Sequence, residues 1–71
     1  MSDWPASKAR KVFKALLHIG WEIKRDIPGS HIKLHRRGYS DYIWSFHDSE
    51  EIGPVMLSKI AKKTGLEPKD L

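Results

Sequence analysis

Residues 8–25 read KARKVFKALLHIGWEIKR, and the pattern of this stretch changes at Gly20. Before the glycine, apolar side chains recur at spacings of three and four residues and therefore share one side of a helix. They are Ala9, Val12, Phe13, Leu16 and Leu17. We expect this helix to span residues 8–19, with the Ser7 hydroxyl capping its first turn. Gly20, which takes up a positive φ without strain, is expected to end it.

The residues that follow the glycine alternate in polarity. Trp21 and Ile23 fall on one face of the chain, and Glu22 and Lys24 fall on the other. This period of two is typical of a half-buried strand, which we expect over residues 21–25.

Two more strands are predicted in the middle of the chain. Pro28-Gly29 favours a type II turn, and the residues from 31 to 36 then alternate again. Arg37-Gly38 allows a second tight connection into a strand over residues 39–47. The apolar face of that strand is expected to consist of Tyr42, Trp44 and Phe46.

The last third of the chain predicts a loop and a second helix. Residues 49–53 are polar and acidic, and Pro54 suits the first position of a helix because its missing N–H is not needed there. The residues on the apolar side of this helix are Met56, Leu57, Ile60, Ala61 and Thr64. Gly65-Leu66 predicts a Schellman ending.

The order helix, three strands, helix predicts an α+β domain. We expect a three-stranded antiparallel sheet with two helices on one face, formed by a single domain over residues 1–71. Residues 1–6 would be an N-terminal arm, and residues 67–71 a short tail.

The composition excludes several classes of protein. A chain of 71 residues with 39% hydrophobic and 31% charged residues suits one soluble globular domain. It has no cysteine, which excludes disulfides, thiolate metal sites and a thiol nucleophile. No apolar run approaches the roughly 18 residues of a membrane span, and the polar start is unlike a secretory signal. We therefore expect a small binding module or a minimal enzyme without a membrane partner.

The positive charge is concentrated in the first half of the chain. The whole sequence carries a net charge of +4, but residues 8–37 alone carry +7 and residues 38–71 carry −2. Such an uneven distribution is typical of a protein that binds a polyanion. The side chains that we expect to contact RNA phosphates are Lys8, Lys11, Lys14, Arg36 and Arg37.

A histidine at the mouth of a turn is the strongest candidate for chemistry. His31 follows Gly29-Ser30 and opens a strand whose polar face also carries Lys33 and His35. Imidazole suits proton transfer near neutral pH, and a nearby lysine stabilises the charge that develops on a phosphate. His31 is therefore the candidate catalytic residue, with Ser30, Lys33 and His35 as auxiliary or phosphate-contacting residues. The alternative that the pattern leaves open is a hydrogen-bonded turn residue at the start of a strand.

No metal ion or other cofactor is expected. His31 and His35 lie on one strand face but are separated by four residues, or roughly 13 Å. They cannot bind one ion by themselves, and no acidic ligand stands at a suitable spacing from them.

Three stretches of this chain occur together in one known family. They are the helix end LLHIGW at residues 16–21, the step GSH at residues 29–31 and the segment EIGPVMLSKIAKKTGL at residues 51–66. Through them the chain, from residue 7 to residue 71, resembles the HicA (YcfA-like) family of small toxins. The closing helix is the most specific part of the resemblance.

The resemblance implies both a fold and an activity. The fold would be that of a double-stranded-RNA-binding domain, with the order α-β-β-β-α. The activity would be that of an mRNA interferase, a toxin that cleaves RNA without the ribosome and is held inactive by a HicB antitoxin. The family's catalytic strand histidine corresponds to His31, which the antitoxin typically covers. Such systems belong to bacteria and archaea, so the resemblance implies a cytoplasmic protein.

Three hypotheses for the function follow. The first is a metal-independent endoribonuclease toxin that acts through His31 on single-stranded mRNA. The second is a non-catalytic RNA-binding module of the same fold, since one histidine is a small catalytic set. The third is an interaction domain whose basic surface binds an acidic protein.

Overall fold

The computed structural model describes residues 4–27 and 31–71. The predicted Pro28-Gly29 turn, the auxiliary residue Ser30 and the first three residues of the expected arm lie outside the described residues. Within the described part, no helix is long and apolar enough to cross a membrane.

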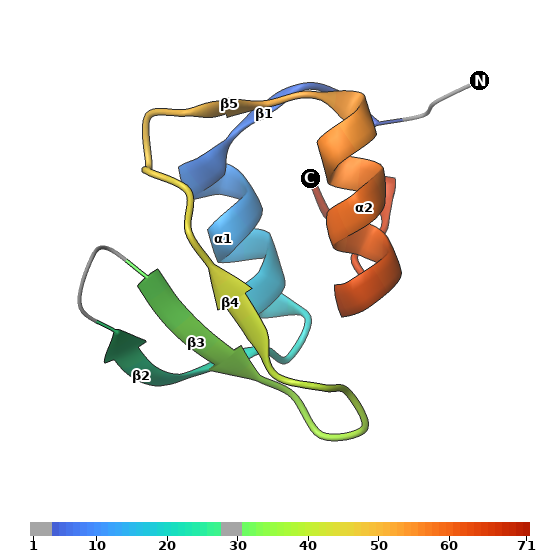
Figure 1. Cartoon of the computed structure of the whole chain (residues 1–71). Coiled ribbons are helices and arrows are strands. Elements are labelled where there is room, and N and C mark those ends of the chain that lie inside the picture. Colours follow the sequence, from blue (N-terminus) through green and yellow to red (C-terminus); the bar gives the residue numbers. More distant parts are fainter. Residues whose placement is uncertain (1–3, 28–30) are drawn as a thin grey trace.

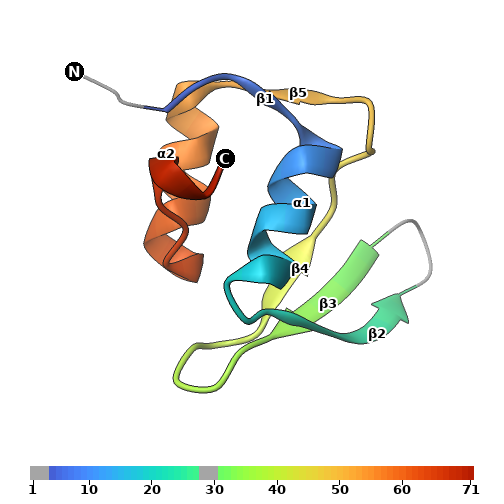
Figure 2. The same cartoon turned by 180° about the vertical axis from the view of Figure 1, so that it is seen from behind.

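The structure is an α+β fold in which two helices lie on one face of a three-stranded antiparallel sheet (Figure 1). The strands of this sheet follow in the order β2-β3-β4, and Figure 2 shows α1 from behind, lying over the sheet with α2 beside it. This arrangement confirms the expected α-β-β-β-α fold. The elements are β1 (Ser7–Lys8), α1 (Ala9–His18), β2 (Glu22–Ile27), β3 (His31–His35), β4 (Tyr42–Trp44), β5 (Glu51–Ile52), α2 (Pro54–Thr64) and the 3₁₀ helix η1 (Pro68–Asp70).

The change of pattern at Gly20 corresponds to a Schellman motif that ends α1. Gly20 has a φ of +114°. Its amide donates to the carbonyl of Leu17 at 3.2 Å, and the amide of Trp21 donates to the carbonyl of Leu16 at 3.0 Å. These two bonds satisfy carbonyls at the helix end and turn the chain directly towards β2.

Trp21 connects the sheet layer to the second helix. Its side chain is buried, and its indole Nε1 donates to the carbonyl oxygen of Thr64 at 2.9 Å. That carbonyl belongs to the last turn of α2, where no backbone N–H of the helix can reach it. The ring also contacts two tyrosines, Tyr39 at a centroid distance of 5.5 Å and Tyr42 at 6.4 Å. The Trp21 side chain thus helps to fix the position of the end of α2 relative to the sheet.

The hydrophobic core lies between the sheet and the helices. Leu34 of β3 and Trp44 of β4 face it from the sheet. Phe13 of α1 packs against Trp44, with a distance of 5.5 Å between the two ring centroids. Burial of these side chains is the main stabilising contribution in a domain without disulfides. The buried apolar residues are Ala9, Val12, Ala15, Leu16, Trp21, Leu34, Trp44, Ile52, Leu57, Ile60 and Leu66.

β1 precedes α1, β5 precedes α2, and these two short strands pair with each other. Two predictions were wrong in this region. Ser7 does not cap α1, because its hydroxyl donates to the carbonyl of Pro5 at 2.9 Å and its backbone belongs to β1. The expected loop over 49–53 contains β5, which pairs antiparallel with β1 through Ser7 opposite Ile52. Ile52 is buried there, so the core extends beneath this pair.

Other predicted boundaries and faces differ in detail. β2 begins one residue later than expected and runs to Ile27, and β4 covers only three of the nine expected residues. Ile23 is 52% exposed and Met56 is 41% exposed, so neither belongs to the core as its pattern indicated. β2 is an edge strand of the sheet and α2 is a surface helix, and both positions leave apolar side chains partly in water.

The second helix ends at Gly65, as predicted, but through a simpler motif than the Schellman ending. Gly65 has a φ of +78°, and its amide donates to the carbonyl of Ala61 at 2.9 Å. The amide of Leu66 donates instead to the Thr64 hydroxyl at 3.3 Å. That hydroxyl in turn donates to the carbonyl of Ile60 at 2.8 Å, so a side chain completes the helix end.

Trp21→Phe tests the bond between the indole and α2. The phenyl ring retains much of the apolar contact but has no N–H, so the buried Thr64 carbonyl loses this donor. We expect the free energy of unfolding to fall by about 1–3 kcal/mol, measured by urea denaturation followed by far-UV circular dichroism. Val55→Ala, at a residue that is 74% exposed, should change it by less than about 0.5 kcal/mol. Equal losses in the two variants would contradict this role of the indole.

Gly65→Ala and Gly38→Ala form a matched pair. Both glycines have a positive φ, so alanine should cost about 1–2 kcal/mol of stability at either position. At Gly65 a Cβ would also lie 2.5 Å from the Tyr39 hydroxyl, whereas at Gly38 it would meet nothing within 4 Å. Displacing Tyr39 from Trp21 should add about 0.5–1.5 kcal/mol to the loss at Gly65. The midpoint of thermal unfolding should therefore be lower for Gly65→Ala than for Gly38→Ala. The reverse order would contradict the close approach of Tyr39 to Gly65.

Candidate nucleic-acid interface

The face of the sheet that points away from the helices is the candidate site, and we call it the open face. Ile32 and Leu34 of β3 contact the core, so the side chains that alternate with them lie on the open face. Residues paired across antiparallel strands share a face, which extends the assignment to both neighbouring strands. The described side chains on the open face are Glu22, Lys24, Arg25, His31, Lys33, His35, Asp41 and Ile43.

A β-bulge in β2 places two consecutive basic residues on the open face. Ile23 is paired with Leu34 and Arg25 is paired with Lys33, so β2 has one residue more than β3 between these pairs. In a bulge the extra residue shares a face with its neighbour instead of alternating. Lys24 accordingly reaches across the sheet to Asp41, while Arg25 lies opposite Lys33.

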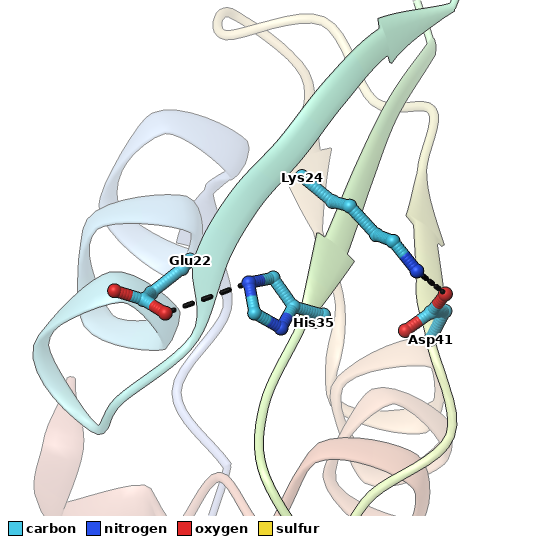
Figure 3. Close-up of polar contacts among 4 residues, drawn as sticks. All are labelled: Glu22, Lys24, His35 and Asp41. Carbon is cyan, nitrogen blue, oxygen red and sulfur yellow. Dashed lines mark hydrogen bonds and ion pairs between the residues drawn. The ribbon is translucent and has the colours of Figure 1, made fainter.

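Two ion pairs occupy the end of the open face at which β3 finishes (Figure 3). The Nε2 atom of His35 lies 3.5 Å from a Glu22 carboxylate oxygen, and Lys24 Nζ lies 2.9 Å from Asp41 Oδ2. The hydrogen bond from Lys24 lowers the pKa of Asp41 below its usual range, and the nearby charges of Lys24, Lys33 and His35 contribute further. This end therefore holds acids and bases that compensate one another.

The other end of the open face is basic and holds the predicted catalytic residue. His31 is the first residue of β3 and is exposed to solvent. Lys33, two residues along the same strand, is partly buried and lies opposite the exposed Arg25. Among residues 4–27 and 31–71, neither Lys33 nor Arg25 takes part in an ion pair. The histidine thus shares this face with two cations that form no ion pair with a carboxylate of the described residues.

Of the residues predicted from the sequence, His31, Lys33 and His35 share one face of β3, with Lys33 two residues from each histidine. His35 lies at the far end of β3, beside Glu22. Arg25, by contrast, was not among the predicted site residues. Simple alternation along β2 would place it on the core side with Ile23, and only the bulge moves it to the open face. A bulge leaves no recognisable signal in a strand of six residues.

The predicted phosphate-binding lysines of the first helix lie in a different layer. Lys11 and Lys14 are exposed on the side of α1 that faces away from the core. Lys8 belongs to β1, and its Nζ donates to the carbonyl of Ser49 at 3.3 Å. These residues therefore form a second basic surface, which α1 and the core separate from the open face.

The two arginines after β3 have different surroundings. Arg37 is exposed. Arg36 is partly buried, its guanidinium lies 4.7 Å from the centre of the Tyr39 ring, and its Nη1 donates to the Thr64 carbonyl at 3.4 Å. The structure therefore gives Arg36 a part in the contact between α2 and the sheet, next to the Trp21 indole.

Across the described ranges, no three histidine or acidic side chains come together in a way that could hold a metal ion. The described open face offers the exposed His31, two cations that form no ion pair within the described residues, and the contacts of Lys24 with Asp41 and of His35 with Glu22. Chemically, such a surface can bind an anion near His31 and transfer a proton to or from it.

Comparison with known families places most of the chain within one of them. The sequence model of a family described as HicA toxin of bacterial toxin-antitoxin matches residues 9–66, which is well over half of the chain. No curated protein matches the chain. No solved structure matches it either.

Lys24→Met tests the electrostatics of the open face. Without the Lys24 ammonium, the pKa of Asp41 should rise towards the usual value for a carboxyl group, as measured by carboxyl-carbon NMR titration. Lys33→Met should raise it less, because Lys33 acts only through its charge. In the wild type the lowered pKa means that this interaction stabilises the fold above the usual carboxyl pKa and is lost as the pH falls through the folded value. A larger effect of Lys33→Met would contradict this arrangement.

Proposed function

The chain belongs to the HicA toxin family of bacterial toxin–antitoxin systems, and from this membership we propose that it is an endoribonuclease that cleaves mRNA. The observation that carries the proposal is the position of His31, exposed at the basic end of the open face next to Lys33. Proton transfer and anion binding are the two functions that metal-independent RNA cleavage requires, and these two side chains can supply both.

The proposed reaction uses the 2′-hydroxyl of the RNA as the nucleophile. His31 takes the proton of this hydroxyl, and the 2′ oxygen then attacks the adjacent phosphorus atom. The bond from phosphorus to the 5′ oxygen breaks, and the imidazolium of His31 returns the proton to that leaving oxygen. The products are a 2′,3′-cyclic phosphate and a 5′-hydroxyl, so atoms and charges balance without a metal ion. The Lys33 ammonium stabilises the negative charge that develops on the phosphoryl oxygens.

His35 has no direct part in this proposal. Four residues of strand separate it from His31, or roughly 13 Å, which is too far for both imidazoles to act on one phosphate. Its nearest charged partner is Glu22 at 3.5 Å. We assign it to the compensated end of the open face, where it contributes to the local charge balance.

The lysines of the first helix are proposed to bind a more distant part of the same RNA. Lys11 and Lys14 lie in the helix layer, so they cannot contact the phosphate that His31 acts on. Their exposed charges can hold flanking phosphates of a long substrate, and such contacts weaken steeply with salt.

The family also supports a specific partner. We propose that a HicB-type antitoxin neutralises this chain by covering the open face, which would exclude RNA from His31. Both the substrate mRNA and such an antitoxin belong to the cytoplasm, which is where we place its action.

His31→Ala should abolish RNA cleavage. Loss of the group that transfers the proton should lower the rate by about 10²–10⁴-fold. The assay uses a labelled single-stranded mRNA in EDTA, with folding of each variant verified by circular dichroism. His18→Ala, at the exposed end of α1, is the matched control and should cleave at the wild-type rate.

The outcomes separate the proposal from its alternative. Cleavage by the wild type and His18→Ala, but not by His31→Ala, supports the assignment. Equal cleavage by His31→Ala would refute the role of this histidine. If no protein cleaves RNA but the wild type still shifts it on a native gel, the chain is a non-catalytic RNA-binding module of the same fold.

A further inference from the structure

We propose that Arg25 and Lys33 together bind one phosphodiester group of single-stranded RNA beside His31. This inference rests on the proposed function and adds to it a phosphate-binding residue, Arg25, and the position of the bound phosphate. The two residues lie directly opposite each other on neighbouring strands of the sheet.

The bulge in β2 creates this pair. Because β2 has one extra residue between its pairs with Leu34 and Lys33, Arg25 emerges on the open face rather than on the core side. Arg25 is exposed, and Lys33 is partly buried between the two neighbouring strands. A guanidinium and an ammonium side by side offer several N–H donors to the oxygens of one phosphate.

The pair is unfavourable for the protein alone. Like charges directly opposite each other in an antiparallel sheet destabilise it. The charge of Lys24 is compensated by Asp41. No acidic side chain in the described part of the chain forms an ion pair with Arg25 or Lys33. A bound anion is the simplest compensation for two such charges, so the pair points to an anionic ligand.

The position of the pair fits the proposed reaction. His31 and Lys33 are two residues apart on the same face of β3, which separates them by roughly 6.6 Å along the strand. A phosphate held by the pair therefore lies close enough for His31 to act on the same nucleotide step. At the opposite end of the open face the Lys24 ammonium is already paired with Asp41, so it is less available to a phosphate than Arg25 and Lys33 are.

The test measures RNA affinity without cleavage. The probe is a fluorescein-labelled 2′-O-methyl oligoribonucleotide, which lacks the nucleophilic hydroxyl, and binding is followed by fluorescence anisotropy from low to moderate salt. The proteins are the wild type, Arg25→Gln, Lys33→Gln and the double variant. Lys62→Gln, which removes the same charge from the exposed side of α2, is the matched control. Cleavage of unmodified RNA by the wild type is measured in parallel.

We expect each single variant to bind roughly three- to tenfold more weakly, with the same loss for oligonucleotides of different sequence. If one phosphate is shared, the double variant should reduce the slope of log affinity against log salt by about 0.7. The thermal midpoints of Arg25→Gln and Lys33→Gln should equal or exceed that of the wild type, because a repulsion is removed. A purely structural role would instead lower these midpoints.

Two results would overturn this inference and leave the proposed function intact. One is affinity of the Arg25 and Lys33 variants equal to that of Lys62→Gln while the wild type still cleaves unmodified RNA. The other is a slope reduction of about 1.4 in the double variant, which would mean two separate phosphates. A wild type that neither binds nor cleaves RNA would overturn both the inference and the proposed function.

Discussion

The contact between Trp21 and the last turn of α2 is the constraint on which the rest of the structure depends. The indole closes the core from the sheet side and at the same time donates to the Thr64 carbonyl. Arg36 donates to the same oxygen, and Tyr39 lies between the two donors. Because these groups come from three parts of the chain, α2 and the turn after β3 cannot move independently. The open face is consequently supported from behind by one layer of helices.

The helices and the central part of the sheet could be predicted from the sequence because their signals are local. Leu16 and Val12 repeat with helical spacing, and Gly20 and Gly65 mark the two helix ends through their positive φ. The pairing of Ser7 with Ile52 could not be predicted, since strands of two residues have no period to detect. The exposure of Ile23 could not be predicted either. Alternation assigns a residue to one face of a strand but does not show whether another element covers that face.

The candidate site also contains residues that the sequence predicted and residues that it did not. The position of His31 on the polar face of a strand followed from the alternation of its neighbours. Arg25 did not, because a bulge reverses that alternation at a single point. Arg36 resembled an ordinary surface cation in the sequence, since the Thr64 carbonyl to which it donates is 28 residues away in the chain. Long-range contacts therefore decide which of the basic residues remain available to a ligand.

The bond from Trp21 to Thr64 joins residues 43 positions apart, and this separation has a consequence for how active copies are made. Synthesis proceeds from the N-terminus, so α1 and the sheet exist as nascent chain before their covering helix has been translated. A product that stops short of Thr64 lacks the acceptor of the indole and part or all of α2. A message broken within this reading frame yields only such incomplete chains, so only an intact message supplies a chain that can close its core against the second helix.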